Sequence, residues 1–281
     1  MPDKIALITG SSSGFGLLTS LELAKAGFRV VATMRDLGRR DRLDQAAVAA
    51  GVAGQLDIRA LDVTNFEALP AFVDAVVRDC GRLDVLVNNA GFAVAGFAED
   101  IRLEELRRQF ETNFFGAVAM TKAVLPIMRR QHSGHIIMVS SIGGLLGSVS
   151  VSSYSASKHA LEGWSESLRL EVNALGIKVV LVEPGAYLTD IWTRGAVMGE
   201  KATQETSPNI QRILRMRDRI QALPKRDPIE VARLIASIAQ DPNPELRYLV
   251  GRDAKIQLAM KRILPWKRFE KVIANFLKID G

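Results

Sequence analysis

The chain has 281 residues, of which 48% are hydrophobic and 24% are charged, and its formal net charge is +6. This suffices for a large core in one domain, or in one domain with a lid, and the single cysteine, Cys80, excludes an intrachain disulfide and favours a reducing compartment. The chain shows no signal-peptide pattern and no run of about 18 apolar residues, so we expect a cytoplasmic protein without membrane-spanning helices.

The first predicted strand, 5–8, leads directly into a glycine-rich turn and a helical pattern. In this context a glycine motif can bind the pyrophosphate of a dinucleotide. Gly10 permits a tight turn, Gly14 leaves room for phosphate at backbone N–H groups, and Gly16 lets the helix pack on the strand. An ordinary strand–helix connection is the competing interpretation. We predict cofactor contacts from Gly10, Ser12, Ser13, Gly14, Phe15 and Gly16.

The second predicted strand, 28–33, ends where the adenosine ribose of a dinucleotide would lie. An acidic residue there would bind the 2′-hydroxyl, but this sequence has Thr33, and Arg35 follows with a guanidinium that suits a 2′-phosphate. Asp36 weakens this inference, and a solvated loop charge is the competing interpretation of Arg35. We favour NADP(H) as cofactor and keep NAD(H) as the alternative.

The third and fourth predicted strands, 57–61 and 85–87, also end in polar residues. Asp62 is placed either to accept from an adenine amino group or to cap the helix that begins near Phe66. The sequence Asn88-Asn89-Ala90-Gly91 can bridge neighbouring strands and leave a flat floor for the ribose and nicotinamide.

A helical pattern over 103–130 contains Asn113 in its middle and Gly116 nearby, where both residues are unfavourable. An interior asparagine can bond the backbone or a water and bend a helix. We therefore expect an irregular helix here, with an exposed asparagine as the alternative.

The fifth predicted strand, 135–139, delivers Ser140 and Ser141, and a helix with Tyr154 and Lys158 follows. These two residues are four apart, so they lie one turn apart on one helix face. A lysine ammonium would lower the phenol pKa from its reference of about 10, which would make Tyr154 an acid/base group. Taken alone, the pair could equally be an exposed helical pair.

The remaining predicted elements are a strand at 178–182, an arginine-rich flap with a short amphipathic helix, a helix starting at Asp227-Pro228 and a seventh strand at 247–250. Alternating strands and helices predict a Rossmann-like, doubly wound parallel α/β sheet of about seven strands in one domain. We assign the catalytic domain to 1–254, with a substrate flap at 186–227, and a basic amphipathic helix to 255–281.

From Lys4 to Gly251 the chain resembles the short-chain dehydrogenase/reductase family. The motifs that carry the resemblance are TGSSSGFG (9–16), DV (62–63), NNAG (88–91), Asn113, Ser141, YSASK (154–158) and PGAYLT (184–189). Seven motifs in order at the family's spacing are far more specific than any one of them.

The resemblance implies that Tyr154 is the acid/base, that Lys158 tunes it and holds the ribose hydroxyls, and that Ser141 bonds the substrate oxygen. It further implies that Asn113 holds a water for proton relay, and that no metal takes part. The additional cofactor contacts it implies are Val63, Asn89, Ala90, Gly91, Tyr154, Lys158, Pro184, Gly185 and Thr189, besides Arg35 and Asp62.

The segments ATMRD (32–36), NNAGFAVAGFAED (88–100) and ETNFFG (111–116) are similar to the branch of 17β-hydroxysteroid and retinol dehydrogenases. This similarity implies a bulky apolar alcohol or ketone as substrate. We also expect a homodimer or homotetramer. The alternatives are a β-ketoacyl reductase and a protein that senses the nicotinamide cofactor without turnover.

The C-terminal segment combines an apolar stripe with basic residues. Lys267, Arg268 and Lys271 lie between apolar residues at helical spacing, namely Trp266, Phe269, Val272, Ile273, Phe276 and Leu277. Such a helix can lie on an anionic membrane surface, cover a substrate pocket or pack on a second subunit. A helix docked on its own domain is the simpler alternative, and we find no nucleic-acid-binding motif.

Overall fold

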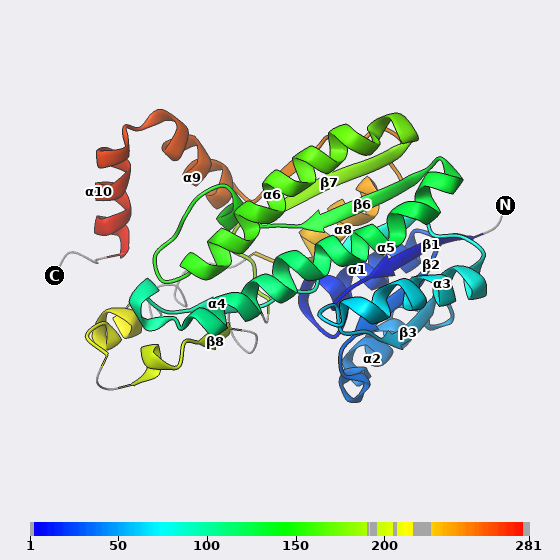
Figure 1. Ribbon diagram of the computed structural model, residues 1–281, viewed down its shortest axis with the longest axis horizontal. Coiled ribbons are helices and arrows are strands. Elements are labelled where there is room, and N and C mark those ends of the chain that lie inside the picture. The colour runs from blue at the N-terminus through cyan, green and yellow to red at the C-terminus, as the bar shows by residue number, and fades with distance from the viewer. Residues whose placement is uncertain (1–2, 190, 192–195, 205–206, 216–225, 278–281) are drawn as a thin grey trace.

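The computed structural model describes residues 3–189, 191, 196–204, 207–215 and 226–277. A seven-stranded sheet, parallel throughout, crosses the molecule in the order β3-β2-β1-β4-β6-β7-β9 (Figure 1). This confirms the predicted doubly wound sheet, and its order reverses direction between β1 and β4. The strands are β1 (Lys4–Ile8), β2 (Phe28–Met34), β3 (Leu56–Ala60), β4 (Val85–Asn88), β6 (Gly134–Val139), β7 (Ile177–Pro184) and β9 (Arg247–Val250).

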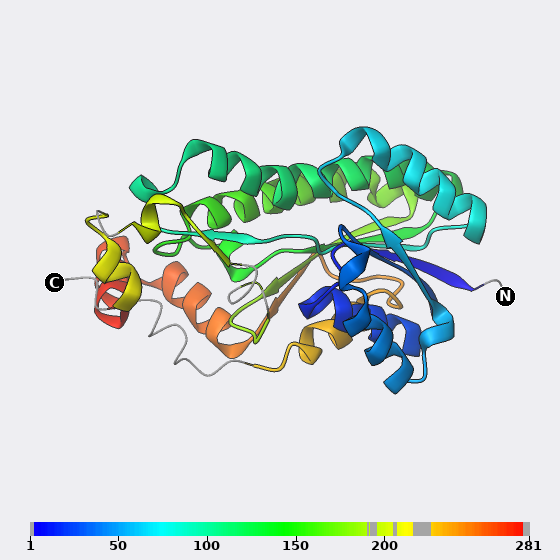
Figure 2. The ribbon, with the colours of Figure 1, turned by 90° about the horizontal axis from the view of Figure 1, so that it is seen from below.

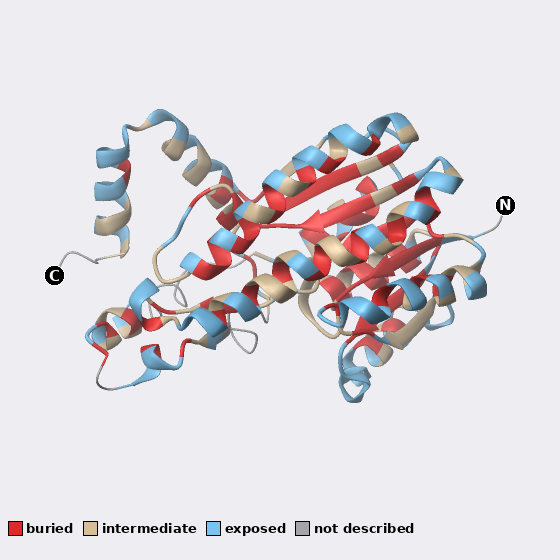
Figure 3. Cartoon of the chain, in the orientation of Figure 1, coloured by how far each residue is buried: buried red, intermediate tan, exposed pale blue. Residues whose placement is uncertain are grey.

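Helices cover both faces of the sheet, as Figure 2 shows. One layer contains α1 (Gly14–Lys25), α2 (Asp41–Ala49) and α8 (Ile229–Ile238); the other contains α3 (Leu69–Cys80), α5 (Gly116–Gln131) and α6 (Ser152–Val172). Along β1, Ala6 and Ile8 pack into the first layer, while Ile5 and Leu7 pack into the second. The central strands β1, β4, β6 and β7 are therefore buried on both faces, which explains why they read as largely apolar runs, whereas the edge strands β3 and β9 are only partly buried (Figure 3).

The helical stretch 103–130 is interrupted at the predicted irregularity. It consists of α4 (Leu103–Phe110), a π-helical turn η5 (Glu111–Phe115) that contains Asn113, and α5. Gly116 allows the close approach that follows, since a Cβ there would lie 2.8 Å from Cγ2 of Val63. Such single π turns are frequent at functional sites.

A second, two-stranded sheet was not predicted. β5 (Ala93–Ala95) follows the Asn-Asn-Ala-Gly segment and pairs in parallel with β8 (Ala196–Met198), which lies in the predicted flap. The flap also contains η9 (Lys201–Thr203), and buried Asp100 accepts from Ser207 Oγ at 2.9 Å and from Asn209 Nδ2 at 3.1 Å. Of the amphipathic helix predicted near 210–220, residues 210–215 are helical and the remainder lies outside the described residues.

The C-terminal segment differs from the prediction. The single helix predicted over 255–281 is in fact two helices, α9 (Arg252–Ile263) and α10 (Trp266–Leu277), which extend away from the sheet (Figure 1). The helix is interrupted at Leu264 and Pro265, because proline has no N–H to donate and disfavours a helical conformation in the residue before it. None of the helices in the described ranges combines the length and apolar character that crossing a membrane requires.

Candidate active site

A cleft of about 750 Å³ opens at the carboxyl ends of the central strands, where open α/β sheets bind ligands. It brings together almost all of the predicted site residues. The predicted residues that line it are Gly10, Ser12, Ser13, Gly14, Phe15, Arg35, Asp62, Val63, Asn89, Ala90, Gly91, Ser141, Tyr154, Lys158, Pro184, Gly185 and Thr189. Gly16 and Asn113 lie outside this lining.

The glycine turn has the backbone conformation that its sequence predicts. Gly10 and Gly14 have φ values of +74° and +57°, which side chains rarely adopt. A Cβ on Gly16 would lie 2.3 Å from the carbonyl oxygen of Gly10 and 2.4 Å from Nδ2 of Asn89, so only glycine fits there. The turn therefore presents backbone N–H groups at the start of α1, the arrangement that binds phosphate.

Asn89 and Thr9 tie the ends of β1 and β4 together. Asn89 Nδ2 donates to the carbonyl oxygens of Thr9 and Gly10 at 2.8 and 3.0 Å, and Thr9 Oγ1 accepts from the backbone N–H groups of Asn89 and Ala90 at 3.0 Å each. Asn88 donates to Thr121 Oγ1 at 2.9 Å. The expected bridging by the paired asparagines is confirmed, and it holds Ala90 and Gly91 as a fixed floor.

Ser141, Tyr154 and Lys158 lie together at the other end of the cleft. Ser141 is hydrogen-bonded to Tyr154 and also accepts from the backbone N–H of Gly143 at 3.1 Å. Lys158 Nζ donates to the carbonyl oxygen of Val139 at 2.7 Å and lies 5.8 Å from the centroid of the Tyr154 ring. Tyr154 and Lys158 are each only 5% exposed, so both act in a desolvated environment.

The pKa of Tyr154 moves in the opposite direction to the one predicted from Lys158. Burial raises the pKa of Tyr154 to about 12, and the hydrogen bond with Ser141 opposes this shift. Burial also lowers the pKa of Lys158 to about 8, against the attraction of Glu162. The Lys158 ammonium donates to Val139 O, and burial sets the direction of the shift in the Tyr154 pKa, so the phenol is held in its protonated form.

Asn113 lies beneath the cleft floor. Its Oδ1 accepts from the backbone N–H of Phe92 at 3.1 Å, and its Nδ2 donates to Phe92 O at 3.0 Å and to Ser157 Oγ at 3.5 Å. Asn113 is 1% exposed, which excludes the alternative of an exposed asparagine. Its side chain holds the floor against α6, and its role in a water relay stays a prediction.

The predicted residues Arg35 and Asp62 line the cleft where the adenosine ribose is expected, and Arg39, which was not predicted, joins them. Arg35 and Arg39 both line the cleft, while Asp36 accepts from the backbone N–H of Gly38 and so caps the short turn between them. Asp62 Oδ1 accepts from the backbone N–H and the hydroxyl of Thr64 at 2.9 and 2.7 Å, which closes a turn before the helix. The helical segment near Phe66 has Asn65 at its N-cap and no side-chain cap, so the capping alternative is wrong, and an adenine contact stays a prediction.

Several lining residues were not found from the sequence, among them Phe92, Arg108, Tyr187, Ile191 and Val197. Tyr187 is buried, donates to Glu230 Oε2 at 3.0 Å and packs edge-on against Phe15 at 5.7 Å. The Arg108 guanidinium lies 5.6 Å from the Phe92 ring centroid. Val197 reaches the cleft because β8 pairs with β5. Each of these strands is only three residues long, and such short segments do not indicate a pairing partner in the sequence.

Comparison with known proteins gives consistent results. The profile of the family described as short chain dehydrogenase matches residues 4–196. The chain is 41% identical over 280 residues to the uncharacterized oxidoreductase YusZ of Bacillus subtilis, covering 99% of each. It is 36% identical to retinol dehydrogenase 8 of Bos taurus (93% of this chain, 86% of that protein) and 37% identical to 17-beta-hydroxysteroid dehydrogenase type 1 of Mus musculus (88% and 74%).

Solved structures agree. A short-chain dehydrogenase from Streptomyces avermitilis has a TM-score of 0.81 at 34% identity, covering 99% of this chain and 97% of that one. Two others, at 27% identity, are ElxO with NADP bound (TM-score 0.73; 88% and 96% covered) and a dehydrogenase/reductase from Burkholderia phymatum in complex with NAD (0.79; 92% and 93%). The chain therefore belongs to the short-chain dehydrogenase/reductase family of oxidoreductases and resembles its 17β-hydroxysteroid and retinol dehydrogenase branch.

Proposed function

We propose that this protein is an NADP(H)-preferring oxidoreductase that interconverts a hydrophobic alcohol and its ketone or aldehyde. The observation that carries the proposal is the buried group of Ser141, Tyr154 and Lys158 at one end of a cleft whose other end is a glycine turn at a helix N-terminus. A proton donor and a phosphate-binding turn in one cleft are what reduction with a nicotinamide cofactor needs.

The residues present fit such a cofactor. The left-handed glycines Gly10 and Gly14 open backbone N–H groups toward a pyrophosphate, and the floor at Ala90-Gly91 offers a flat surface for the ribose and nicotinamide. Arg35 and Arg39, which follow β2 and line the cleft, are suited to a 2′-phosphate, which favours NADP(H) over NAD(H). When bound, the nicotinamide would supply or accept the hydride.

The chain's own residues would handle the proton. The Tyr154 hydroxyl would give its proton to the substrate oxygen during reduction and recover it through the water relay predicted at Asn113. Ser141 would donate to the same oxygen and fix its position, while the Lys158 ammonium would hold ribose hydroxyls and stabilise the phenolate that forms. Asp62 and Val63, with Pro184, Gly185 and Thr189, would complete the cofactor's surroundings.

An apolar substrate is supported by apolar side chains in the cleft lining. Phe92, Ile191 and Val197 line the same cleft as Tyr154, and two relatives named above act, by their names, on retinol and a hydroxysteroid. The flap that carries Val197 would then set the size of substrate that enters.

The test is oxidation of NADPH with a panel of apolar ketones and aldehydes, comparing the wild type with Tyr154→Phe. We expect the variant to lose at least about a hundred-fold in kcat while it still binds NADPH, because only the proton donor is removed. Tyr248→Phe is the matched control, since Tyr248 lies on β9 outside the cleft lining and its hydroxyl accepts from the backbone N–H of Glu245. Full activity in Tyr154→Phe, or no turnover of any carbonyl by the wild type, would contradict the proposal.

We further propose that α10 contacts an anionic membrane surface and thereby helps lipophilic substrates to enter. Its exposed apolar residues include Trp266 and Val272, and Lys267, Arg268 and Lys271 lie between them. Sedimentation with anionic vesicles should exceed that with neutral vesicles, and equal recovery would refute the contact. We also propose that the protein forms a homodimer or homotetramer, and light scattering of the purified protein would measure its mass.

A further inference from the structure

Three consecutive residues at the end of β6 are each held by a side chain of α6. Lys158 donates to Val139 O, Ser140 Oγ donates to Glu162 Oε1, and Ser141 bonds Tyr154. Since 154, 158 and 162 are spaced four apart, the three side chains project from successive turns of one helix face. Tyr154 and Lys158 have roles in the proposed reaction, whereas Glu162 has none.

The turn that follows Ser141, η6 (Ile142–Gly144), closes over two of these contacts. A Cβ at Gly143 would lie 3.2 Å from Cε1 of Tyr154 and 3.5 Å from Oγ of Ser141. At Gly144 it would lie 2.8 Å from Oγ of Ser140 and 2.9 Å from Cγ of Glu162. The Glu162–Ser140 contact is therefore packed in the same way, and by the same turn, as the Ser141–Tyr154 contact.

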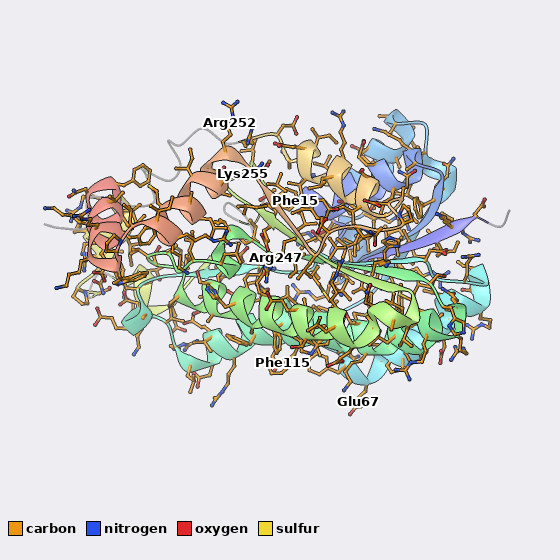
Figure 4. The ribbon with its side chains drawn as sticks, turned by 90° about the horizontal axis from the view of Figure 1, so that it is seen from above. Phe15, Glu67, Phe115, Arg247, Arg252 and Lys255 are labelled. Carbon is orange, nitrogen blue, oxygen red and sulfur yellow. The ribbon has the colours of Figure 1, made fainter. Side chains whose placement is uncertain are left out.

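Glu162 is a buried anion whose counter-charge comes from another part of the sheet. Arg247 on β9 donates through Nη1 to Glu162 and, at 2.6 Å, to Glu183 Oε1, and through Nη2 to the exposed Glu166 at 2.5 Å. The side chains of Glu162 and Glu183 are 5% and 2% exposed. Figure 4 shows Arg247 beside α6. Buried charges are costly to keep, and fixing one arrangement of a site is one reason to retain them.

We propose that Glu162, held by Arg247, is a positioning residue of the active site: it fixes Ser140 and thereby Ser141, and it lies one helical turn from Lys158 on the same face of α6. This inference rests on the function proposed above. Glu162 touches neither the cleft nor the reacting atoms, so it acts through Ser140 and through its field at Lys158.

The electrostatic half follows from the groups around Glu162. Lys158 and Glu166 face it from α6, Glu183 from β7 and Arg247 from β9, and Arg262 of α9 lines the crevice outside Arg247. Burial lowers the pKa of Lys158 and Glu162 raises it, while burial and Glu162 together raise the pKa of Glu183 to about 7. Glu162 is thus the buried anion that sustains the Lys158 ammonium near neutral pH.

The experiment measures kcat, KM and the pH dependence of ketone reduction for E162Q, E162D and S140A. The amide in E162Q still accepts from Ser140 but carries no charge, so the alkaline fall in kcat/KM should move to lower pH by about one unit. S140A removes the hydroxyl through which Glu162 fixes the end of β6, so kcat should fall about ten-fold while the pH midpoint and the KM for NADPH stay unchanged. E162D keeps the charge and should restore the midpoint.

E166Q is the matched control, because Glu166 contacts the same guanidinium from the exposed side and should leave both quantities unchanged. Wild-type kcat in S140A together with a wild-type pH midpoint in E162Q would overturn the inference. Should E162Q not fold, as a thermal melt would show, wild-type kcat in S140A alone would overturn it. A fully active Tyr154→Phe would instead overturn the proposed function, so the two failures are distinguishable.

Discussion

The two ends of the cleft are built in different ways. The nucleotide end, around β1 and β4, consists largely of backbone: a glycine turn, a helix N-terminus and the Thr9–Asn89 bridge, all close to the strand ends that carry them. The catalytic end joins β6, β7, β9 and α6 through buried side chains distant in sequence, such as Glu162, Glu183 and Arg247. Short motifs reveal the glycine turn and also Ser141, Tyr154 and Lys158, whereas the buried cluster behind these three residues depends on tertiary contacts.

The largest expected effect concerns the nucleotide end. Gly16→Ala places a Cβ 2.3 Å from the backbone oxygen of Gly10, so the turn has to move and NADPH affinity should fall more than about a hundred-fold. Gly163→Ala is the control: Gly163 lies in α6 outside the cleft lining, and a Cβ there would have no neighbouring heavy atom within 4 Å. Equal NADPH affinities of the Gly16 variant and the control variant, measured by fluorescence titration, would show that the close packing at Gly16 is not required for binding.

At the catalytic end, Arg247→Met should lower the free energy of unfolding by about 3–5 kcal/mol, because it leaves two buried carboxylates without their counter-charge. Urea unfolding measures this loss. A change below about 1 kcal/mol would mean that the buried cluster is not a structural requirement of this end.

The same cluster predicts a pH dependence. Because the pKa of Glu183 rises from 4.5 to about 7 on folding, the folded chain binds the extra proton between these values. Its stabilising contribution is therefore complete below pH 4.5 and is lost as pH rises toward 7. In Glu183→Gln the free energy of unfolding should decrease less than in the wild type between acid and neutral pH. An identical decrease in both proteins would contradict the assignment.

A smaller effect is expected from the charges at the ribose end. Arg35→Ala and Arg39→Ala should each weaken NADPH binding by about ten-fold and leave NADH binding nearly unchanged, because only NADPH carries the 2′-phosphate. Arg40→Ala is a neighbouring control, since Arg40 pairs with Asp44 instead. An unchanged ratio of the NADPH and NADH affinities would show that neither arginine contacts the 2′-phosphate.

The smallest effect concerns α10, which lies outside both ends of the cleft. Trp266→Ala should change the free energy of unfolding by less than about 1 kcal/mol, since Trp266 is 59% exposed, and should reduce binding to anionic vesicles. Phe269→Ala is the contrasting variant: Phe269 is buried, and its loss should cost about 3 kcal/mol. Equal costs would show that α10 docks through both residues.

The same contrast explains how far the sequence could be interpreted. The seven strands, the glycine turn and the irregularity at Asn113 follow from local signals, namely apolar runs, glycine spacing and a polar residue inside a helix. The pairing of β5 with β8 joins residues about a hundred apart, and nothing in either short segment indicates it. The pKa of Tyr154 was predicted in the wrong direction because the neighbour is visible in the sequence and the burial is not.

Pro265 is a local signal for the end of a helix, but the apolar stripe begins only after it, at Trp266, so the stripe indicates α10 and not α9. Arg39 was missed for a different reason. It reaches the cleft only through the short turn that Asp36 caps, and Asp36 by itself looks like a charge that would repel phosphate.

The β5–β8 pairing has a consequence for exchanging parts between relatives. β5 begins at Ala93, directly after Gly91 and Phe92 of the cleft floor, and the strand that pairs with it, β8, belongs to the flap. A chimera that borrows another enzyme's flap to change substrate preference therefore has to import both halves of this small sheet, 93–95 together with 196–198. Transplanting one half alone would unsettle the floor on which the nicotinamide is proposed to rest.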